Sequence, residues 1–268
     1  MRPGAAGEVA ALLGEARRAA RPVPEIPPDI RPTTSDEAYD VQDALHRFLC
    51  AASGDGRAGW KVGATTPGMQ AYLGVDGPAY GHILTDSMLA NGATLPAAEF
   101  CNPGIECEIA VRLSADADSG PYDRDRIAAV IGAVFPAIEI VENRYGDFLA
   151  RGTPTLIADD FFHKACVPGM ATEAWHALDL AALAGRTLID GTERGAGTGA
   201  DVMGHPLEAV AWLANARAAR GAPLSAGDIV LTGSVAPVIW IESFPADARI
   251  EIEEIGDVSV RFEADAPP

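Results

Sequence analysis

The stretch PGIECEIAV, residues 103–111, alternates apolar and acidic side chains and predicts a β-strand. Its apolar face would carry Ile105, Cys107, Ile109 and Val111, and its other face Glu106 and Glu108. Two carboxylates about 4 Å apart repel by about 4 kcal/mol at an effective dielectric constant of about 20. Solvent, a shared proton or a cation would relieve this repulsion. Carboxylates without His or Cys partners suit Mg²⁺, Mn²⁺ or Ca²⁺.

A second copy of the E-x-E pattern shows how ambiguous the spacing is. Glu251 and Glu253 lie in RIEIEEIG, residues 249–256, beside a predicted hairpin turn. We expect solvent to accommodate this pair, because charged side chains usually stay exposed. Near the first pair, however, Glu139 lies inside the apolar strand FPAIEIVE, where an unpaired carboxylate would be costly to bury. Spacing alone does not decide between solvent and a metal ion.

Composition limits the class of protein. The chain has 268 residues, of which 48% are hydrophobic, and this is enough for one large domain. Its formal net charge of −18 argues against nucleic acid and anionic membrane surfaces as partners. The sequence has no apolar run of about 18 residues and no secretory signal, so we expect a cytoplasmic protein that acts on a small molecule. The cysteines are expected to be reduced thiols: Cys50, Cys101, Cys107 and Cys166.

The order of predicted elements indicates an α+β fold. Helices are expected at residues 8–20, 35–52, 125–133 and 206–220, with strand-like runs between and after them. The last two strands would be joined by a hairpin at EIGDV, residues 254–258. We therefore predict a helical N-terminal segment, residues 1–57, on a β-rich catalytic body, residues 58–268, as one integrated domain.

Several ordered motifs make the chain recognisable. They are GWKVGAT (59–65), YLGVDGP (72–78), PGIECEIAVRL (103–113), FPAIEIVENR (135–144), MGHPLEAVAWLAN (203–215) and GDIVLTGS (227–234). In this order they resemble the 2-keto-4-pentenoate hydratase family, which includes related 2-oxo-acid hydratases and 4-oxalocrotonate decarboxylases within the fumarylacetoacetate hydrolase superfamily. The resemblance extends from Glu8 to Phe262 and implies a mixed β-sheet roll or barrel of the fumarylacetoacetate hydrolase C-terminal type.

The resemblance also implies a site. Glu106, Glu108 and Glu139 match the positions that bind Mg²⁺ or Mn²⁺, and the ion would hold the 1-carboxylate and 2-oxo oxygen of a substrate. Lys61 would place a cation, and potentially an acid–base group, near the ion and the substrate. The implied substrate contacts are Thr232, Gly233 and Ser234, with Arg144 as a partner for a second, distal carboxylate. His205 is expected to cap or pack a helix rather than to catalyse.

Two departures from the family fall where the substrate would bind. Typical hydratases read P-D-[FY]-G where this chain has Ala79, so the usual acid–base Asp is missing. They also carry small side chains after D-N, where this chain has Phe161 and Phe162. His82 and His163 are therefore candidate acid–base residues, because imidazole exchanges protons near pH 7.

The resulting hypothesis is a metal-dependent lyase that acts on a 2-oxo acid or its 2-hydroxydienoate tautomer. Hydration of the dienoate is the first expectation, and decarboxylation of a 2-oxo diacid is the alternative, because both reactions pass through the same enolate. Hydrolysis of an acylpyruvate and a non-catalytic partner subunit are further alternatives. We expect a homo-oligomer, with a complex with a related decarboxylase or hydratase as a further option, and no nucleic-acid or membrane partner.

Overall fold

The computed structural model describes residues 1–54, 56–118 and 120–264. Its α-helices are α1 (Ala5–Arg18), α2 (Ser35–Ser53), α3 (Pro67–Leu73), α4 (Arg124–Ala128), α5 (Thr153–Ala158) and α6 (Pro206–Ala219). Its strands are β1 (Arg57–Gly63), β2 (Ala79–Leu84), β3 (Ala93–Pro96), β4 (Pro103–Leu113), β5 (Ile131–Glu142), β6 (His163–Pro168), β7 (Ala184–Ile189), β8 (Thr192–Thr198), β9 (Ile229–Ser234), β10 (Ile239–Trp240), β11 (Ala246–Ile252) and β12 (Gly256–Glu263).

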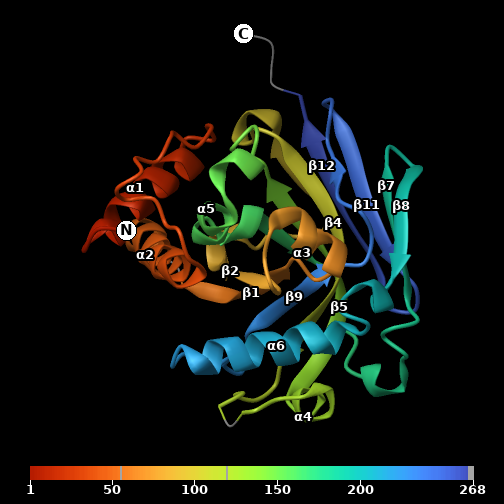
Figure 1. The fold of residues 1–268 in the computed structure, drawn as a ribbon. Coiled ribbons are helices and arrows are strands. Elements are labelled where there is room, and N and C mark those ends of the chain that lie inside the picture. The colour runs from red at the N-terminus through yellow and green to blue at the C-terminus, as the bar shows by residue number, and fades with distance from the viewer. Residues whose placement is uncertain (55, 119, 265–268) are drawn as a thin grey trace.

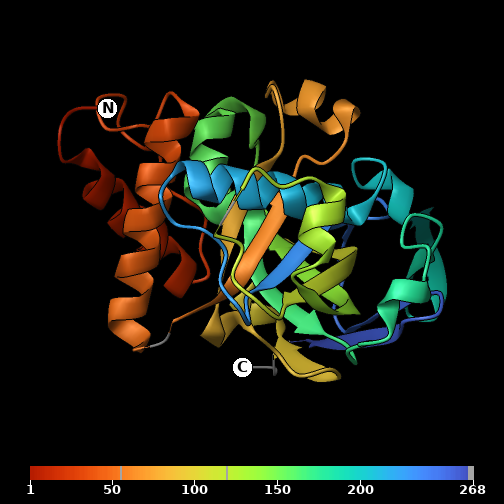
Figure 2. The same cartoon turned by 90° about the horizontal axis from the view of Figure 1, so that it is seen from below.

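The described strands form two sheets. The first has the order β2-β1-β9-β4-β5-β6, with β10 beside β4, and the second has the order β3-β12-β11-β7-β8. The first sheet mixes the parallel pair β1 and β9 with antiparallel neighbours and curls into a half-barrel (Figure 1). The helices α1 and α2 lie side by side at one end of the molecule, and β7 and β8 lie at the other (Figure 1, Figure 2). The predicted α+β class is confirmed.

Strand β4 is buried on both faces. The predicted apolar face of β4 consists of Ile105, Cys107, Ile109 and Val111. These side chains pack into the large core, to which β11 and β12 also contribute. The other face of β4 carries Ala110, which belongs to a separate cluster with Ala137, Cys166 and Leu231 from β5, β6 and β9. Residues paired directly across neighbouring strands share a face. The glutamates of β4 therefore lie on the inner face of the curled sheet.

The helix ends differ from the predictions in instructive places. The predicted helix 125–133 is wrong in its second half, because α4 ends at Ala128 and β5 begins at Ile131. There Ile131 pairs with Leu113 of β4, and this pairing outweighs the local helical pattern. Helices α3 and α5 have no counterpart among the predicted elements. The hairpin between β11 and β12 is confirmed, with its turn at 253–255 rather than at the Gly-Asp pair.

Helix α6 begins as the sequence predicts. His205 is its N-cap, and His205 Nδ1 accepts a hydrogen bond from the Leu207 backbone N–H at 3.1 Å. Pro206 occupies the first turn, where its missing N–H leaves no intrahelical hydrogen bond unmade. His205 is therefore a capping residue. No helix within residues 1–54, 56–118 and 120–264 is both long and apolar enough to cross a membrane.

The N-terminal helices are tied to the body by buried polar contacts. From α1, Arg17 Nε lies 2.6 Å from Asp159 Oδ1, and Arg17 Nη2 lies 3.1 Å from Asp160 Oδ2. From α2, the Gln42 amide donates to the carbonyl oxygens of Tyr80 and Ile157 at 2.8 and 2.7 Å. We propose that the predicted segments 1–57 and 58–268 form one cooperative domain, although residues 265–268 lie outside the described chain.

Removing Arg17 tests this coupling. We expect Arg17→Ala to lower the free energy of unfolding by about 2–4 kcal/mol, because Asp159 and Asp160 keep their buried charge and lose a partner. Arg21→Ala is the control, since Arg21 pairs with Glu15 at an exposed site and should change stability by less than about 0.5 kcal/mol. Urea unfolding followed by tryptophan fluorescence and circular dichroism measures both variants. Separate transitions for the two segments would contradict the single-domain proposal.

Candidate metal centre

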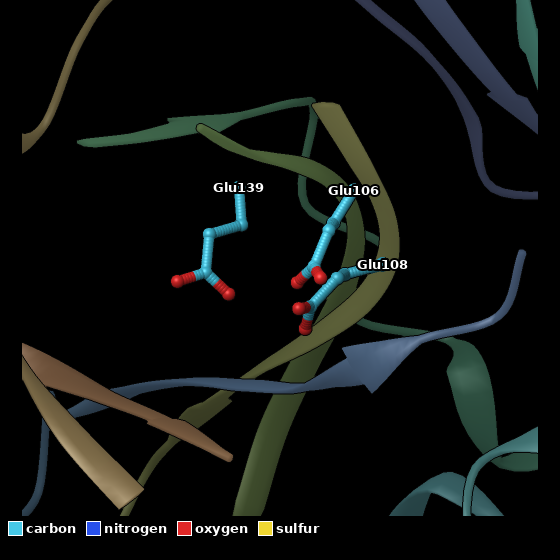
Figure 3. Close-up of side chains that lie close together, drawn as sticks. All are labelled: Glu106, Glu108 and Glu139. Atoms are coloured by element: carbon cyan, nitrogen blue, oxygen red, sulfur yellow. The ribbon is translucent and has the colours of Figure 1, made fainter. Parts of the chain in front are cut away.

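Three carboxylates meet on the inner face of the first sheet. Glu106 pairs directly with Glu139 of β5, and Glu108 follows two residues along β4. One oxygen atom from each side chain can be chosen so that all three lie within 4.8 Å of one another. Figure 3 shows the carboxylate of Glu139 facing those of Glu106 and Glu108 from the neighbouring strand. Glu108 and Glu139 have no solvent exposure, and Glu106 is half-buried.

The second E-x-E pair behaves differently, as predicted. Glu253 is exposed, and the Glu251 side chain keeps 28% exposure and pairs with Arg186 and Arg249. Solvent and arginines therefore accommodate this pair. The two copies of the pattern differ in burial, which their spacing does not reveal.

Each fully buried glutamate has one oxygen held by the protein and one without a hydrogen-bond partner among the described residues. Glu108 Oε2 accepts from the Gly233 backbone N–H at 2.8 Å, and Glu108 Oε1 has no partner. Glu139 Oε1 lies 2.8 Å from His163 Nδ1 and 3.4 Å from Lys61 Nζ, and Glu139 Oε2 has no partner. Buried carboxylate oxygens without a donor are unfavourable. A divalent cation bound by oxygen ligands would satisfy them, so these residues fit such an ion.

The charges of the cluster are strongly coupled. Burial, followed by the charge of Glu139, raises the pKa of Glu106 to about 7. Burial, with the charges of Glu139 and Glu106, raises the pKa of Glu108 well above its usual range. Burial also opposes ionisation of Glu139, but Lys61 and His163 outweigh it and lower the pKa of Glu139. Without a cation, Glu106 and Glu108 therefore hold their protons more strongly than exposed glutamates do.

Lys61 supplies the positive charge beside the cluster. It lies on β1 with 2% exposure, and its Nζ donates to the Phe161 carbonyl oxygen at 3.0 Å. Burial alone would lower the pKa of Lys61, but the charges of Glu139, Glu106 and Glu108 outweigh burial and raise it. Lys61 therefore remains an ammonium group. The structure brings this predicted residue to the three glutamates.

The family is established by comparison with known proteins. The family model described as "Fumarylacetoacetate (FAA) hydrolase C-terminal" matches residues 76–263. The chain belongs to the fumarylacetoacetate hydrolase family. It is 37% identical over 258 residues to a 2-hydroxyhexa-2,4-dienoate hydratase of Comamonas testosteroni, covering 93% of this chain and 94% of the relative. It is 32% identical to a 2-keto-4-pentenoate hydratase of Burkholderia vietnamiensis, covering 95% and 96% of the two chains.

A solved structure of this family matches nearly the whole chain. It is the 4-oxalocrotonate decarboxylase from Pseudomonas putida G7 complexed with magnesium and adipate. The TM-score is 0.89 at 27% identity, with 96% of this chain and 97% of that chain covered. The resemblance found in the sequence is thus confirmed, and so is the expected type of fold.

The two departures from typical hydratases meet in one apolar cluster. Ala79 pairs with Gly63, and a Cβ atom on Gly63 would lie 2.4 Å from the ring of Phe161. Phe161 and Ala79 both belong to the cluster that joins the N-terminal helices to the body. The Phe161 ring also lies 5.2 Å from Lys61 Nζ. An aromatic side chain therefore fills the region beside Lys61.

Phe161 lies in a strained turn. Asp160, Phe161 and Phe162 have φ angles of 52°, 50° and 71°, in the left-handed region that side chains with a Cβ disfavour. The carboxylate of Asp160 accepts from the His82 backbone N–H at 2.9 Å and pairs with Arg17. Lys61 holds the Phe161 carbonyl. Buried charges therefore maintain this backbone, and it presents the Phe161 carbonyl to Lys61.

The structure does not bring His82 to the glutamates. His82 pairs with Trp60, whereas Lys61 pairs with Gly81, so His82 points to the opposite face of the sheet from Lys61. Its ring stacks on His46 at 4.4 Å between centroids, and its Nδ1 lies 3.2 Å from Asp160. His82 therefore contacts the strained turn through Asp160, on the face of the sheet opposite to Lys61.

The remaining predicted residues lie in two groups. Arg144 is 1% exposed and pairs with Asp159 and Glu142, the latter at 3.5 Å. Its ion pairs within the described part of the chain do not include Glu106, Glu108 or Glu139. The turn Thr232-Gly233-Ser234 does reach the cluster, through the Gly233 N–H. Its hydroxyl groups bond to backbone instead: Thr232 donates to Ile109 O at 2.7 Å, and Ser234 donates to Ala236 O at 2.6 Å.

Two groups beside the site were not predicted from the sequence: the Phe161 carbonyl and the Ser87 hydroxyl. The Phe161 carbonyl is a backbone group, and residue identity carries no signal for it. Ser87, in the short turn Thr85–Ser87, has its Oγ 3.4 Å from His163 Nε2. A serine in a polar turn between strands is too common a feature to single out.

Replacing one glutamate tests the centre by stability. In wild type, Mg²⁺ at about 100 times its dissociation constant should add about 2.7 kcal/mol to the free energy of unfolding. Glu108→Gln should abolish this gain, and it should raise the melting temperature of the metal-free protein, because the raised pKa of Glu108 opposes folding and an amide has no proton to take up on burial. The control Glu253→Gln should respond to Mg²⁺ as wild type does. Equal stabilisation of Glu108→Gln by Mg²⁺, measured by scanning calorimetry, would contradict the assignment.

Metal binding should also depend on pH. The pKa values of Glu106 and Glu108 are raised, so protons compete with the cation, and this competition weakens as the pH rises. We expect the apparent affinity for Mg²⁺ to increase between about pH 6 and about pH 8, with release of protons on binding. Isothermal titration in buffers of different ionisation enthalpy measures both quantities. An affinity that stays constant across this range is the opposing result.

Proposed function

We propose that this chain is a divalent-metal-dependent lyase that adds water to a 2-hydroxy-2,4-dienoate, the tautomer of a 2-oxo-4-enoic acid. The observation that carries the proposal is the pair of buried carboxylates, Glu108 and Glu139, each with an unpartnered oxygen beside the buried ammonium of Lys61. Support comes from relatives named as hydratases that align over more than nine-tenths of the chain.

Glu106, Glu108 and Glu139 would hold the cation, and Mg²⁺ or Mn²⁺ is the choice that fits carboxylate oxygens. When bound, the cation supplies a Lewis acid for the substrate's 1-carboxylate and 2-oxo oxygens. Gly233 orients Glu108 through its N–H, and we assign Thr232 and Ser234 to shaping the substrate-facing turn. Phe161 limits the space beside Lys61 and keeps water from that side of the cluster.

Lys61 is the residue placed to move protons. As an ammonium group it can donate a proton to C5 of the dienol, and the amine that results can take up the proton of the enol O–H, which gives a 2-oxo-3-enoic acid. Water then adds at C4, and C3 takes up a proton. Each turnover adds one water molecule and consumes no other reactant. Lys61 would return to its charged form because the glutamates favour the ammonium.

Decarboxylation of a 2-oxo diacid is the second candidate, because the decarboxylase from Pseudomonas putida G7 matches 96% of the chain. A diacid needs a cation for its second carboxylate. Arg144, the sequence candidate for this role, is buried and already pairs with Asp159 and Glu142. This pairing favours a substrate with one carboxylate and therefore hydration.

We also propose a cytoplasmic homo-oligomer, as the charge and composition suggest. A complex with a related decarboxylase or hydratase is compatible with either reaction. Sedimentation velocity of the purified protein determines the oligomeric state, and a purely monomeric species would overturn that part of the proposal.

A substrate panel tests the reaction. With Mg²⁺ or Mn²⁺ present, we expect loss of dienol absorbance from 2-hydroxy-2,4-dienoates, incorporation of labelled water oxygen at C4 and no release of CO₂. Glu108→Gln should lose turnover by at least about 100-fold, and Glu253→Gln should retain it. Release of CO₂ from a 2-oxo diacid would favour the decarboxylase. Cleavage of acylpyruvates would favour a hydrolase, and no turnover of any substrate would favour a partner subunit.

A further inference from the structure

We propose that His163 is a positioning residue of the metal centre, which fixes one oxygen of Glu139 so that the other is presented to the cation. The inference rests on the proposed function and assigns His163 a role other than proton transfer to substrate.

The hydrogen bond between His163 and Glu139 is short and buried. His163 Nδ1 lies 2.8 Å from Glu139 Oε1, and the two residues have 2% and 0% exposure. An ionised carboxylate only accepts hydrogen bonds, so Nδ1 carries the proton in this contact. The same oxygen faces Lys61 Nζ at 3.4 Å. Two donors thus converge on Oε1.

The other oxygen of Glu139 has no such donor. Glu139 Oε2 is buried and has no hydrogen-bond partner among the described residues. The Glu139 carboxylate faces Glu106 and Glu108 (Figure 3). With Oε1 held by two donors, rotation of the carboxylate would break both contacts. Glu139 is therefore set to offer a single oxygen, Oε2, to the shared cation.

The imidazole of His163 is itself held from its far side. His163 Nε2 lies 3.4 Å from Ser87 Oγ, and the Ser87 hydroxyl donates to the Leu84 carbonyl at 2.8 Å. The segment after Ser87 is attached to β6, since the Leu89 N–H donates to the Cys166 carbonyl at 2.8 Å. Both ring nitrogens of His163 therefore lie next to protein groups, Nδ1 next to Glu139 and Nε2 next to the Ser87 hydroxyl. This arrangement suits an orienting group better than a proton donor to substrate.

Three variants separate the two ring nitrogens. His163→Asn keeps an N–H donor near the Nδ1 position, His163→Gln moves the donor toward the Nε2 position, and His163→Ala removes both. We expect Ala and Gln to weaken Mn²⁺ binding by about 10–100-fold and Asn by less than about threefold. His176→Ala, at an exposed site, is the matched control and should bind Mn²⁺ as wild type does.

Isothermal titration and the electron paramagnetic resonance signal of free Mn²⁺ measure these affinities on the full chain, with circular dichroism to establish that each variant is folded. Wild-type affinity in His163→Ala would overturn the inference, as would equal weakening in the Asn and Ala variants. If Mn²⁺ affinity changes as expected while no dienoate is hydrated, the positioning role stands and the proposed reaction fails. If affinity is unchanged and only kcat and its pH profile change, His163 is an acid–base residue and the inference fails.

Discussion

Burial of negative charge is the constraint on which the rest of this structure depends. The register of β4 against β5 places Glu106 opposite Glu139 and brings Glu108 beside them, on a face that also carries apolar residues such as Ala110, Ala137 and Leu231. Apolar surroundings of this kind lower the effective dielectric constant, so the charges of the cluster interact more strongly than they would in water. The Gly233 N–H donates to one oxygen of Glu108, and Lys61 and His163 face one oxygen of Glu139. The other oxygen of each of these two glutamates has no donor within residues 1–54, 56–118 and 120–264.

The position of Lys61 beside the buried glutamates also depends on contacts with the N-terminal helix α1. Lys61 is held by the Phe161 carbonyl, and the turn that presents this carbonyl is left-handed at three successive residues. Such a backbone persists only where its surroundings enforce it. Arg17 from α1 and the backbone N–H of His82 hold Asp160 in this turn. The N-terminal helices, which lie before the residues matched by the family model, thus take part in positioning the ammonium group.

Much of this arrangement could be predicted from the sequence. The alternating pattern predicted that Glu106 and Glu108 share one strand face. The apolar neighbours of Glu139 indicated an unusual carboxylate. Only the family resemblance predicted that these three residues form one metal site. The burial that separates them from Glu251 and Glu253 comes from strand order, which local pattern does not encode. The opposite directions of Lys61 and His82 follow from the pairing of β1 with β2. The left-handed turn has no sequence signal, because Arg17, which pairs with Asp160 in this turn, lies far away along the chain.

The order of Lys61 and the three glutamates along the chain determines the order in which they are synthesised. Lys61 lies before the residues matched by the family model, and all three glutamates lie within them. Because synthesis proceeds from the N-terminus, the ammonium group leaves the ribosome before any of the carboxylates that it neutralises. A fragment limited to residues 76–263 would carry the acidic cluster without its counter-charge. In the folded protein, β1 therefore supplies a positive charge to strands that follow it in the chain, and Arg17 of α1 pairs with Asp160 in the turn whose Phe161 carbonyl contacts Lys61.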